Sequence, residues 1–216
     1  MDYHKIECPF NRSTEGNKEI IWGSYRNETV EFLKDIQYDF TEKVDGISIK
    51  ICYNGYRVSI EGRTDKSIIP KFLYDALSDM FYTNEVEELF EQLFGDKEVI
   101  LFGEGYGTKI QGVGKQYRED NGFILFDVMI NGNYQSRKTV EEIAKAFGID
   151  VVPIVLTGTL EDGYKYVMSH PTSVIAKDPT LYMEGVVARP HVELKDCCGN
   201  RIIVKIKWKD FKSFVK

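Results

Sequence analysis

Lys43 is the residue of this sequence that is best placed to act as a nucleophile. It lies in the segment TEKVDGIS (residues 41–48), inside a run rich in β-forming residues. Such a lysine is often only a solvated residue of an edge strand. Here, however, Asp45 follows two residues later on the same face of an extended chain, and Gly46 permits a turn or a close backbone approach. Because an unprotonated lysine amine can attack a substrate and hold it covalently, the segment predicts a reactive lysine with an acid beside it.

Further blocks that contain charged or aromatic residues follow Lys43 along the chain. They are EGRT (61–64), FGEG (102–105), FILFD (123–127), EGVVAR (184–189) and KIK (205–207). Lys205 and Lys207 are two residues apart on one expected strand, so they point to one face, where they could hold a triphosphate and favour the neutral amine of Lys43. The other blocks also have plain interpretations. Glu104 could be a turn residue between glycines, Phe126 a core residue, and Arg63 the ion-pair partner of Asp65.

In this order, over residues 40–210, the blocks resemble the nucleotidyltransferase motifs of the covalent lysyl-nucleotide superfamily, which comprises DNA ligases, RNA ligases and mRNA capping enzymes. The chain is most similar to the ATP-dependent RNA ligases of the nick-sealing phage type. That resemblance rests on the Glu-Lys-x-Asp-Gly opening, the aromatic residue before Asp127 and the Lys-x-Lys followed by residues 209–211. One position departs from the pattern, because Ser48 stands where that group commonly has an asparagine with a longer reach.

The resemblance implies that ATP leaves AMP on Lys43 with the help of Mg²⁺ or Mn²⁺, and that AMP then passes to a 5′-phosphate that is sealed to a 3′-OH. The nucleotide contacts that it implies are Glu42, Lys43, Val44, Ser48, Arg63, Glu104, Phe126, Glu184, Lys205 and Lys207. Among these, Glu104 would contact the ribose hydroxyls and Arg63 the ribose or a phosphate. Phe126 would stack on adenine, and Glu184 would organise the metal through water.

Three alternatives stay open at this point: a DNA ligase, a capping-type guanylyltransferase, and a noncatalytic relative that binds nucleotide or RNA. The run Lys207-Trp208-Lys209 gives the guanylyltransferase some support. The triphosphate that labels the protein would separate it from a ligase. A protein that only binds nucleotide or RNA has no need of a reactive amine. The third alternative is therefore disfavoured by the joint presence of the residues that the chemistry needs, which are Lys43, Glu104, Glu184, Lys205 and Lys207.

Strand and helix signals indicate an α+β protein with largely antiparallel sheets. Asn54-Gly55 predicts a hairpin, Asn84 with Glu87 predicts an N-cap and capping box, and Gly95 and Gly148 are expected to end helices. The expected strands are 40–53, 56–62, 99–102, 123–130, 151–156, 185–188 and 202–206, and the expected helices are 71–94 (broken at 83–84), 138–147 and 160–168. The resemblance further implies that residues 1–216 form one ATP-grasp-like nucleotidyltransferase domain without a C-terminal OB domain. In such a domain helices flank the sheets, and the nucleotide is expected in a groove between the sheets.

Composition limits the partners. The chain has 216 residues, 43% of them apolar, and a net charge of −6, whereas proteins that coat nucleic acid are usually basic. Positive charge is expected locally, at residues 201–216 and in the glycine-rich stretch 106–118, where Tyr106 and Tyr117 with nearby lysines suit either a nucleic acid strand or a plain surface loop. No apolar run approaches the roughly 20 residues of a membrane span, so a cytoplasmic, intracellular protein is expected. A monomer is the expected oligomeric state.

The chain ends nine residues after Lys207, too few for a further domain of the kind that ligases and capping enzymes usually carry. The expectation is therefore a minimal ligase that makes the lysyl adduct but engages RNA strand ends weakly and in a salt-sensitive manner. It would depend on an assisting protein partner or prefer strands that are presented as a nicked duplex.

Overall fold

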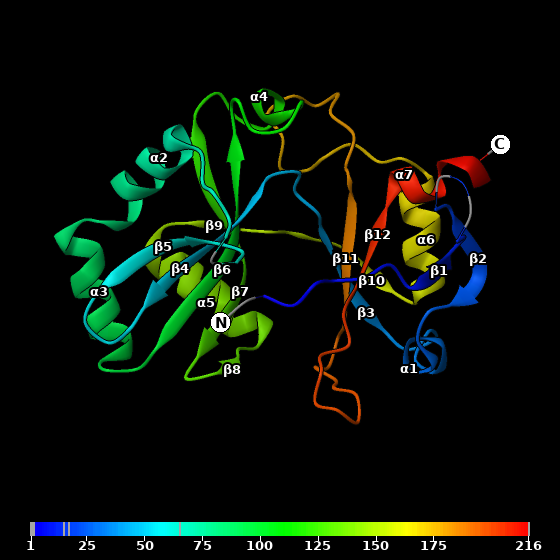
Figure 1. The fold of residues 1–216 in the computed structure, drawn as a ribbon, viewed down its shortest axis with the longest axis horizontal. Helices are drawn as coiled ribbons and strands as arrows, with labels where there is room; N and C mark the ends of the chain where they lie inside the picture. Colours follow the sequence, from blue (N-terminus) through cyan, green and yellow to red (C-terminus); the bar gives the residue numbers. More distant parts are fainter. Residues whose placement is uncertain (1–2, 15, 17, 65, 216) are drawn as a thin grey trace. The chain divides into compact units, whose positions relative to one another are not determined.

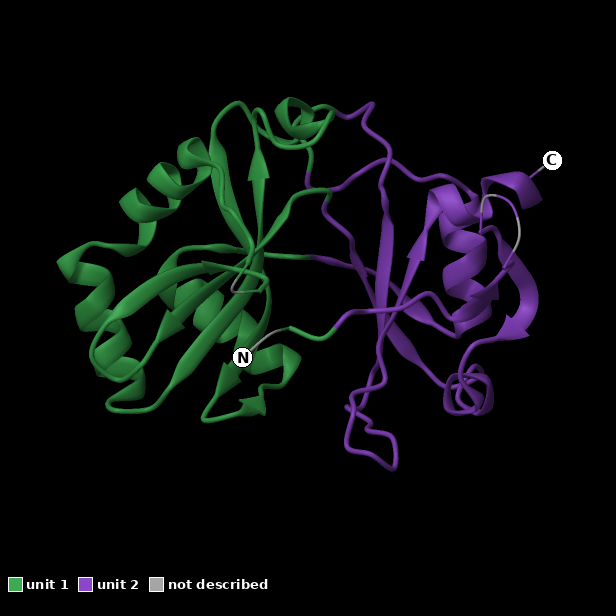
Figure 2. Cartoon of the chain, viewed as in Figure 1, with its two compact units in different colours: residues 1–4, 45–152, 176–178 green, residues 5–44, 153–175, 179–216 purple. Residues whose placement is uncertain are grey.

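The computed structural model describes residues 3–14, 16, 18–64 and 66–215. Its ribbon shows helices packed on antiparallel sheets (Figure 1), which confirms the predicted α+β class. The chain divides into two compact units, coloured separately in Figure 2: unit 1 comprises residues 1–4, 45–152 and 176–178, and unit 2 comprises residues 5–44, 153–175 and 179–216. The boundary lies inside the TEKVDGIS segment, since Lys43 belongs to unit 2 and Asp45 to unit 1.

Unit 1 is built on a sheet in the order β5-β4-β6-β7-β8, with β9 paired to β7. The pairs are antiparallel except β7–β9, which is parallel. The strands are β4 (Ile47–Tyr53), β5 (Val58–Gly62), β6 (Val99–Gly107), β7 (Asn121–Ile130), β8 (Asn133–Tyr134) and β9 (Asp150–Val151). The helices are α2 (Lys71–Phe81), α3 (Asn84–Phe94), α4 (Gly114–Tyr117) and α5 (Arg137–Phe147).

The unit 1 sheet has two unlike faces. Apolar side chains on alternate positions of its central strands, such as Ile49, Ile51 and Leu101, form one core with the buried stripes of α2, α3 and α5. Because successive side chains of a strand point to opposite faces, Ser48 and Glu104 project to the other face. The alternation thus leaves a face with polar groups opposite the one that the helices cover.

Unit 2 has a second sheet in the order β10-β3-β11-β12, all antiparallel, and a two-stranded sheet β1–β2. Its core includes residues of β3, β11 and β12 and the inner side of α6, where Leu160, Tyr164 and Val167 are buried. The strands are β1 (Phe10–Arg12), β2 (Ile20–Tyr25), β3 (Tyr38–Glu42), β10 (Ile154–Gly158), β11 (Gly185–Pro190) and β12 (Val204–Lys207). The helical segments are α1 (Glu28–Phe32), α6 (Leu160–Met168), α7 (Trp208–Phe211) and the 3₁₀ helix η1 (Lys212–Phe214).

The predicted Asn54-Gly55 hairpin joins β4 to β5, and Gly95 and Gly148 end α3 and α5, so these predictions are confirmed. Several predicted boundaries differ from the structure, among them those of two strands and one helix cap. The predicted strand 40–53 breaks into β3 and β4 around the Lys-x-Asp-Gly segment, and the predicted strand 151–156 breaks into β9 and β10 near Pro153, which lacks an N–H for a ladder. The cap of α3 is Thr83, not Asn84, because the Thr83 hydroxyl accepts the N–H of Val86.

One functional domain over residues 1–216 stays a prediction, and both ends of that range lie outside the described residues. Within the part of the chain that is described, no helix has the length and apolar character needed to cross a membrane.

The packing of α6 on β3 gives a first testable prediction. A Cβ added at Gly163 would overlap the ring of Phe40. Gly163→Ala should improve helix propensity by up to about 1 kcal/mol, but overpacking costs about 1–3 kcal/mol, and we expect the second effect to win. Denaturant unfolding should therefore show a net loss of stability. Gly112→Ala, where an added Cβ has open space, is the control, and equal stability of the two variants would contradict this packing.

Candidate active site

Lys43 is held at the end of β3 by both its backbone and its side chain. Its N–H donates to the carbonyl of Gly185 at 3.0 Å, which ties the residue to the start of β11. Its Nζ donates to the Glu184 carboxylate at 2.6 Å and to the carbonyl of Val44 at 3.4 Å. The side chain is 22% exposed. The amine is thus oriented by fixed partners and still open to a substrate.

Glu184 lies between two amines. One carboxylate oxygen accepts from Lys43 and the other from Nζ of Lys207, whose residue faces Gly185 in the β11–β12 pair. Burial alone would raise the pKa of Glu184, but the attraction to Lys43 and the hydrogen bond from Lys207 outweigh it, so the pKa lies below its usual value. Glu184 is therefore an anionic anchor for the two lysines.

Lys205 adds a third amine on the same face of β12. It faces Val187 across the pair with β11, and its N–H donates to the carbonyl of Glu7. Burial lowers the pKa of Lys205, and the charges of Lys207 and Lys43 lower it further. Two of the three amines share the Glu184 carboxylate and Lys205 adds a further positive charge near them, and an excess of positive charge at a partly buried site is suited to bind a polyphosphate.

The two residues beside Lys43 are both buried. The carboxylate of Glu42 is buried and accepts hydrogen bonds from the Ser173 hydroxyl and from the N–H of Val174 at 2.9 Å. Burial raises the pKa of Glu42, while these two hydrogen bonds oppose the rise. This carboxylate anchors the loop at 173–174, and a contact of Glu42 with the nucleotide stays a prediction. Val44 is also buried, at 4% exposure.

The remaining predicted contacts lie in unit 1. Ser48 and Glu104 face each other across the β4–β6 pair and are both partly buried. A Cβ at Gly46 would come within 2.6 Å of the Glu104 side chain and 2.5 Å of the Gly105 carbonyl. Only glycine therefore permits the Lys-x-Asp-Gly segment to pass this close to β6. The structure thus brings Ser48 and Glu104 together.

Phe126 is the extra residue of a β-bulge. Phe102 pairs with Asp127 and Gly103 pairs with Leu125, which leaves Phe126 unpaired between them. A bulge re-aims a side chain, and Phe126 is only partly buried, so its stacking on adenine stays a prediction. Arg63 is exposed in the turn after β5, and Asp65, its alternative partner, lies outside the described residues.

Two residues on unit 1 gave no signal in the sequence. The Tyr3 hydroxyl donates to the buried Asp127 at 2.9 Å across 124 positions of sequence, and the Tyr3 ring meets Phe126 edge-on at 5.2 Å. The Lys50 side chain is 2% exposed and pairs with Glu61 at 3.0 Å. The Tyr3 contact joins distant segments and no local pattern encodes it, whereas Lys50 faces Glu61 directly across the β4–β5 hairpin.

The stretch 106–118 is not an aromatic surface for a nucleic acid strand. Tyr106 and Tyr117 are buried at 4% and 2% exposure, with ring centroids 6.0 Å apart. Arg118 forms an ion pair with Asp120, and its hydrogen bond lowers the pKa of the Asp120 carboxyl to about 2. The two tyrosines are core residues, so this interpretation of the stretch is wrong.

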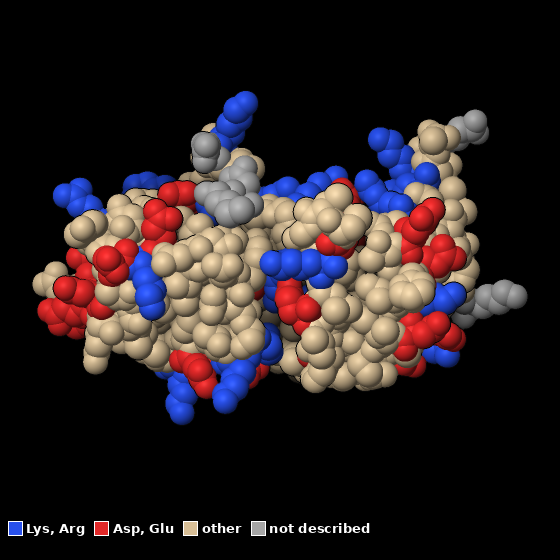
Figure 3. Space-filling view, turned by 90° about the horizontal axis from the view of Figure 1, so that it is seen from below, with Lys and Arg blue, Asp and Glu red and all other residues tan. Residues whose placement is uncertain are grey.

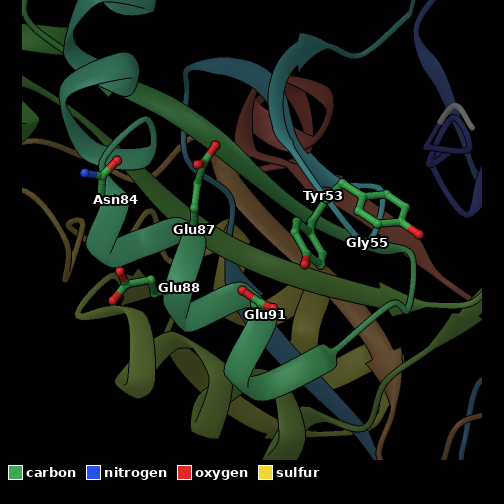
Figure 4. A pocket seen from close by; sticks show the side chains of 7 residues that line it. Tyr53, Gly55, Asn84, Glu87, Glu88 and Glu91 are labelled. Carbon is green, nitrogen blue, oxygen red and sulfur yellow. The ribbon is translucent and has the colours of Figure 1, made fainter.

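A hollow of about 290 Å³ on unit 1 does not suit phosphate. Glu87, Glu88 and Glu91 of α3 line it together with Tyr53 and Asn84 (Figure 4), and these acids would repel an anion. In Figure 3, acidic side chains gather at the left of the view and elsewhere lie among basic ones. The lysine cluster on unit 2 is therefore the better candidate for a phosphate site.

A family model described as RNA ligase matches residues 36–207 of the chain. The chain belongs to the RNA ligase family. The match includes all of the amines and acids described above. Family membership confirms the resemblance that the sequence motifs indicate, at the level of this family.

Solved structures of Naegleria gruberi RNA ligase share the fold. A ligand-free aspartate mutant is 18% identical at a TM-score of 0.63, over 86% of this chain and 53% of that one. A lysine mutant with ATP and Mn is 16% identical at a TM-score of 0.64, and the match covers 98% of this chain and 63% of that one. The enzyme with pyrophosphate is 17% identical at a TM-score of 0.63, and the match covers 94% of this chain and 61% of that one. The chain thus spans between about half and two thirds of the length of these ligases. No curated protein matches it by sequence.

The lowered pKa of Glu184 predicts a pH-dependent role in the stability of this RNA ligase family member. A carboxyl whose folded pKa lies below its usual value of 4.5 stabilises the fold above that pH, and the contribution is lost as the pH falls through the folded pKa. Glu184→Gln should therefore lower the melting temperature at pH 7, and the deficit should shrink below about pH 4. Glu161→Gln, at an exposed helix pair, is the control. A deficit that is the same at every pH would contradict the ionic anchor.

Proposed function

We propose that the chain is an ATP-dependent RNA ligase that carries AMP on Lys43. The observation that carries this proposal is the Lys43 amine, partly exposed and held by Glu184 beside Lys207. Membership of the RNA ligase family supports it, as does the shared fold with a ligase that has been solved with ATP and Mn. A noncatalytic binder would have no use for an amine fixed in this way.

In the first step, the lone pair of the Lys43 amine attacks the α-phosphorus of ATP. A P–N bond forms, the bond from the α-phosphorus to the bridging oxygen breaks, and pyrophosphate leaves with the bonding electrons. The amine must shed its protons, and because the pKa of Glu184 is low, that carboxylate is a poor base and serves to orient the amine. Solvent is then the final proton acceptor. Lys205 and Lys207 are proposed to stabilise the negative charge that develops on the pyrophosphate.

Glu184 is the residue proposed to meet a divalent cation that arrives with the triphosphate. Among the described residues, no group of three His, Cys, Asp or Glu side chains could hold a metal ion by itself. Mg²⁺ is commonly bound through one or two carboxylates, water and substrate phosphates, and Glu184 could supply such a carboxylate. A cation bound there with ATP would add charge neutralisation at the phosphates.

The nucleoside is proposed to contact unit 1 residues. By family resemblance, Glu104 would accept from the ribose hydroxyls, with Ser48 beside it in register. Phe126 would stack on adenine, since the bulge keeps its ring partly exposed, and Arg63 would contact ribose or phosphate. Glu42 is omitted from side-chain contacts because its carboxylate is committed to Ser173.

Two later steps complete the proposed reaction. An oxygen of a 5′-phosphate attacks the lysyl-bound phosphorus, the P–N bond breaks, and AMP moves to the strand end. The 3′-OH then attacks that 5′-phosphorus, loses its proton and displaces AMP. RNA ends in a nicked duplex are the proposed substrate, while a monomeric state, an assisting protein and an intracellular location stay predictions.

The covalent adduct is the direct test of this function. With ATP and Mg²⁺ or Mn²⁺, we expect an acid-labile AMP adduct on Lys43, located by mass spectrometry of peptides. Lys43→Met should abolish it, whereas Lys71→Met, at an exposed lysine of α2, should not. The proposal would be sunk by a wild-type protein that forms no adduct, or by a Lys43→Met variant that forms it undiminished. GTP in place of ATP as the labelling nucleotide would instead favour the capping-type alternative.

Lys205 should matter for chemistry and not for folding. Loss of one charge-stabilising group commonly costs about 100-fold in rate, so Lys205→Ala should slow adduct formation by about that factor in a single-turnover assay. Its melting temperature should stay the same or rise slightly, because the lowered pKa of Lys205 means that the fold disfavours this charge. A large loss of stability with a normal adduct rate would return Lys205 to a structural role.

A further inference from the structure

Three aromatic rings of unit 2 form a continuous stack. The ring centroids of His170 and Tyr182 are 4.0 Å apart with 12° between their planes, and those of His170 and Trp208 are 4.0 Å apart with 11° between them. His170 is thus the middle ring. Parallel rings at this spacing are stacked in the same manner as neighbouring bases in a nucleic acid strand.

The backbone holds the stack in place. His170 follows the end of α6 in the left-handed conformation, at φ 52°, which a residue with a side chain seldom adopts. The N–H of Met183 donates to the carbonyl of Pro171, and the N–H of Trp208 donates to the carbonyl of Glu184. These bonds fix the three ring-bearing segments to one another.

The stack runs from the interior of unit 2 to its surface. Trp208 packs against the buried core of the unit, whereas Tyr182 is 53% exposed. Because His170 covers one face of the Tyr182 ring, the exposed half includes the other face. Packing accounts for the inner two rings, but it leaves a flat aromatic face open at the outer end.

This open face lies beside the amine cluster along the chain. Tyr182 precedes Glu184 by two residues, and burial alternates along this segment, with Leu181 and Met183 buried and Tyr182 and Glu184 less so. The alternation places Tyr182 and Glu184 on the same side of the chain, about 7 Å apart along it at the spacing of a strand. Trp208 directly follows Lys207, and the exposed Lys209 comes next. An aromatic face combined with neighbouring cations is the arrangement by which proteins hold single strands without regard to sequence.

We propose that Tyr182 is the outer ring of a platform that stacks on a nucleobase of the polynucleotide strand whose end is to be joined. This inference rests on the proposed function, in which the adenine of ATP belongs to Phe126 and the reacting strand must reach Lys43. A flat base would continue the series of rings as its fourth member, with its phosphates toward the lysines.

The test measures strand binding without the chemical step. In a Lys43→Ala background, the Kd for a fluorescent nicked RNA duplex is compared among Tyr182, Tyr182→Phe, Tyr182→Leu and Tyr182→Ala. Loss of one base–aromatic stack should raise the Kd by roughly 5- to 150-fold for Ala and clearly for Leu, while Phe should bind like Tyr. Tyr56→Ala, at a tyrosine of unit 1 that is 83% exposed, is the matched control.

A second probe identifies the base. Abasic residues that flank the nick should weaken binding to the Tyr182 protein but add little to the defect of Tyr182→Ala. Melting curves check that each variant is folded. If Tyr182→Ala does not fold, Tyr182→Leu still tests the proposal. An unchanged Kd in both Ala and Leu variants, no measurable strand binding by the Tyr182 protein, or a raised KM for ATP in the catalytic background would overturn the platform. Binding needs no adduct, so failure of Lys43 adenylylation is distinguished from failure of this proposal.

Discussion

The carboxylate of Glu184 is the contact on which the arrangement of the amines depends. Lys43, just after β3, and Lys207, at the end of β12, approach it from the two sides of β11. Each donates to a different carboxylate oxygen. Without this anion, two partly buried ammonium groups would face one another and repel. Removing one partner of such a buried pair costs much more than the pair contributes in place, so loss of the Glu184 carboxylate should destabilise the fold while both lysines remain.

The sheet order explains how residues that are distant in sequence meet. Strand β11 lies between β3 and β12. Lys43 directly follows β3, Lys205 and Lys207 lie on β12, and Glu184 directly precedes β11. The backbone bonds Lys43 N–H to Gly185 carbonyl and Trp208 N–H to Glu184 carbonyl fix the register. Because a slip of one residue would turn each side chain to the opposite face, this pairing sets the site as much as the side chains do.

Local chemistry made much of the fold predictable. The Asn54-Gly55 hairpin and the helix ends at Gly95 and Gly148 depend on residues close in sequence, and the order of motifs identified the family. What sequence reasoning missed depends on tertiary contacts. The burial of the Glu42 carboxylate requires Ser173, and the His170 stack requires segments up to 38 residues away, a span given by Trp208. No periodicity encodes either contact, and the tyrosines of 106–118 were misjudged for the same reason.

The central claim is that Lys43, Glu184 and Lys207 act as one unit on a nucleoside triphosphate. A double-mutant cycle on the single-turnover rate of adduct formation tests it most directly, with Glu184→Gln, Lys207→Met and the two combined. Groups that act as a unit are strongly non-additive. The account predicts that the double variant is slowed about as much as the more impaired single variant. A slowdown equal to the product of the two single effects would contradict it.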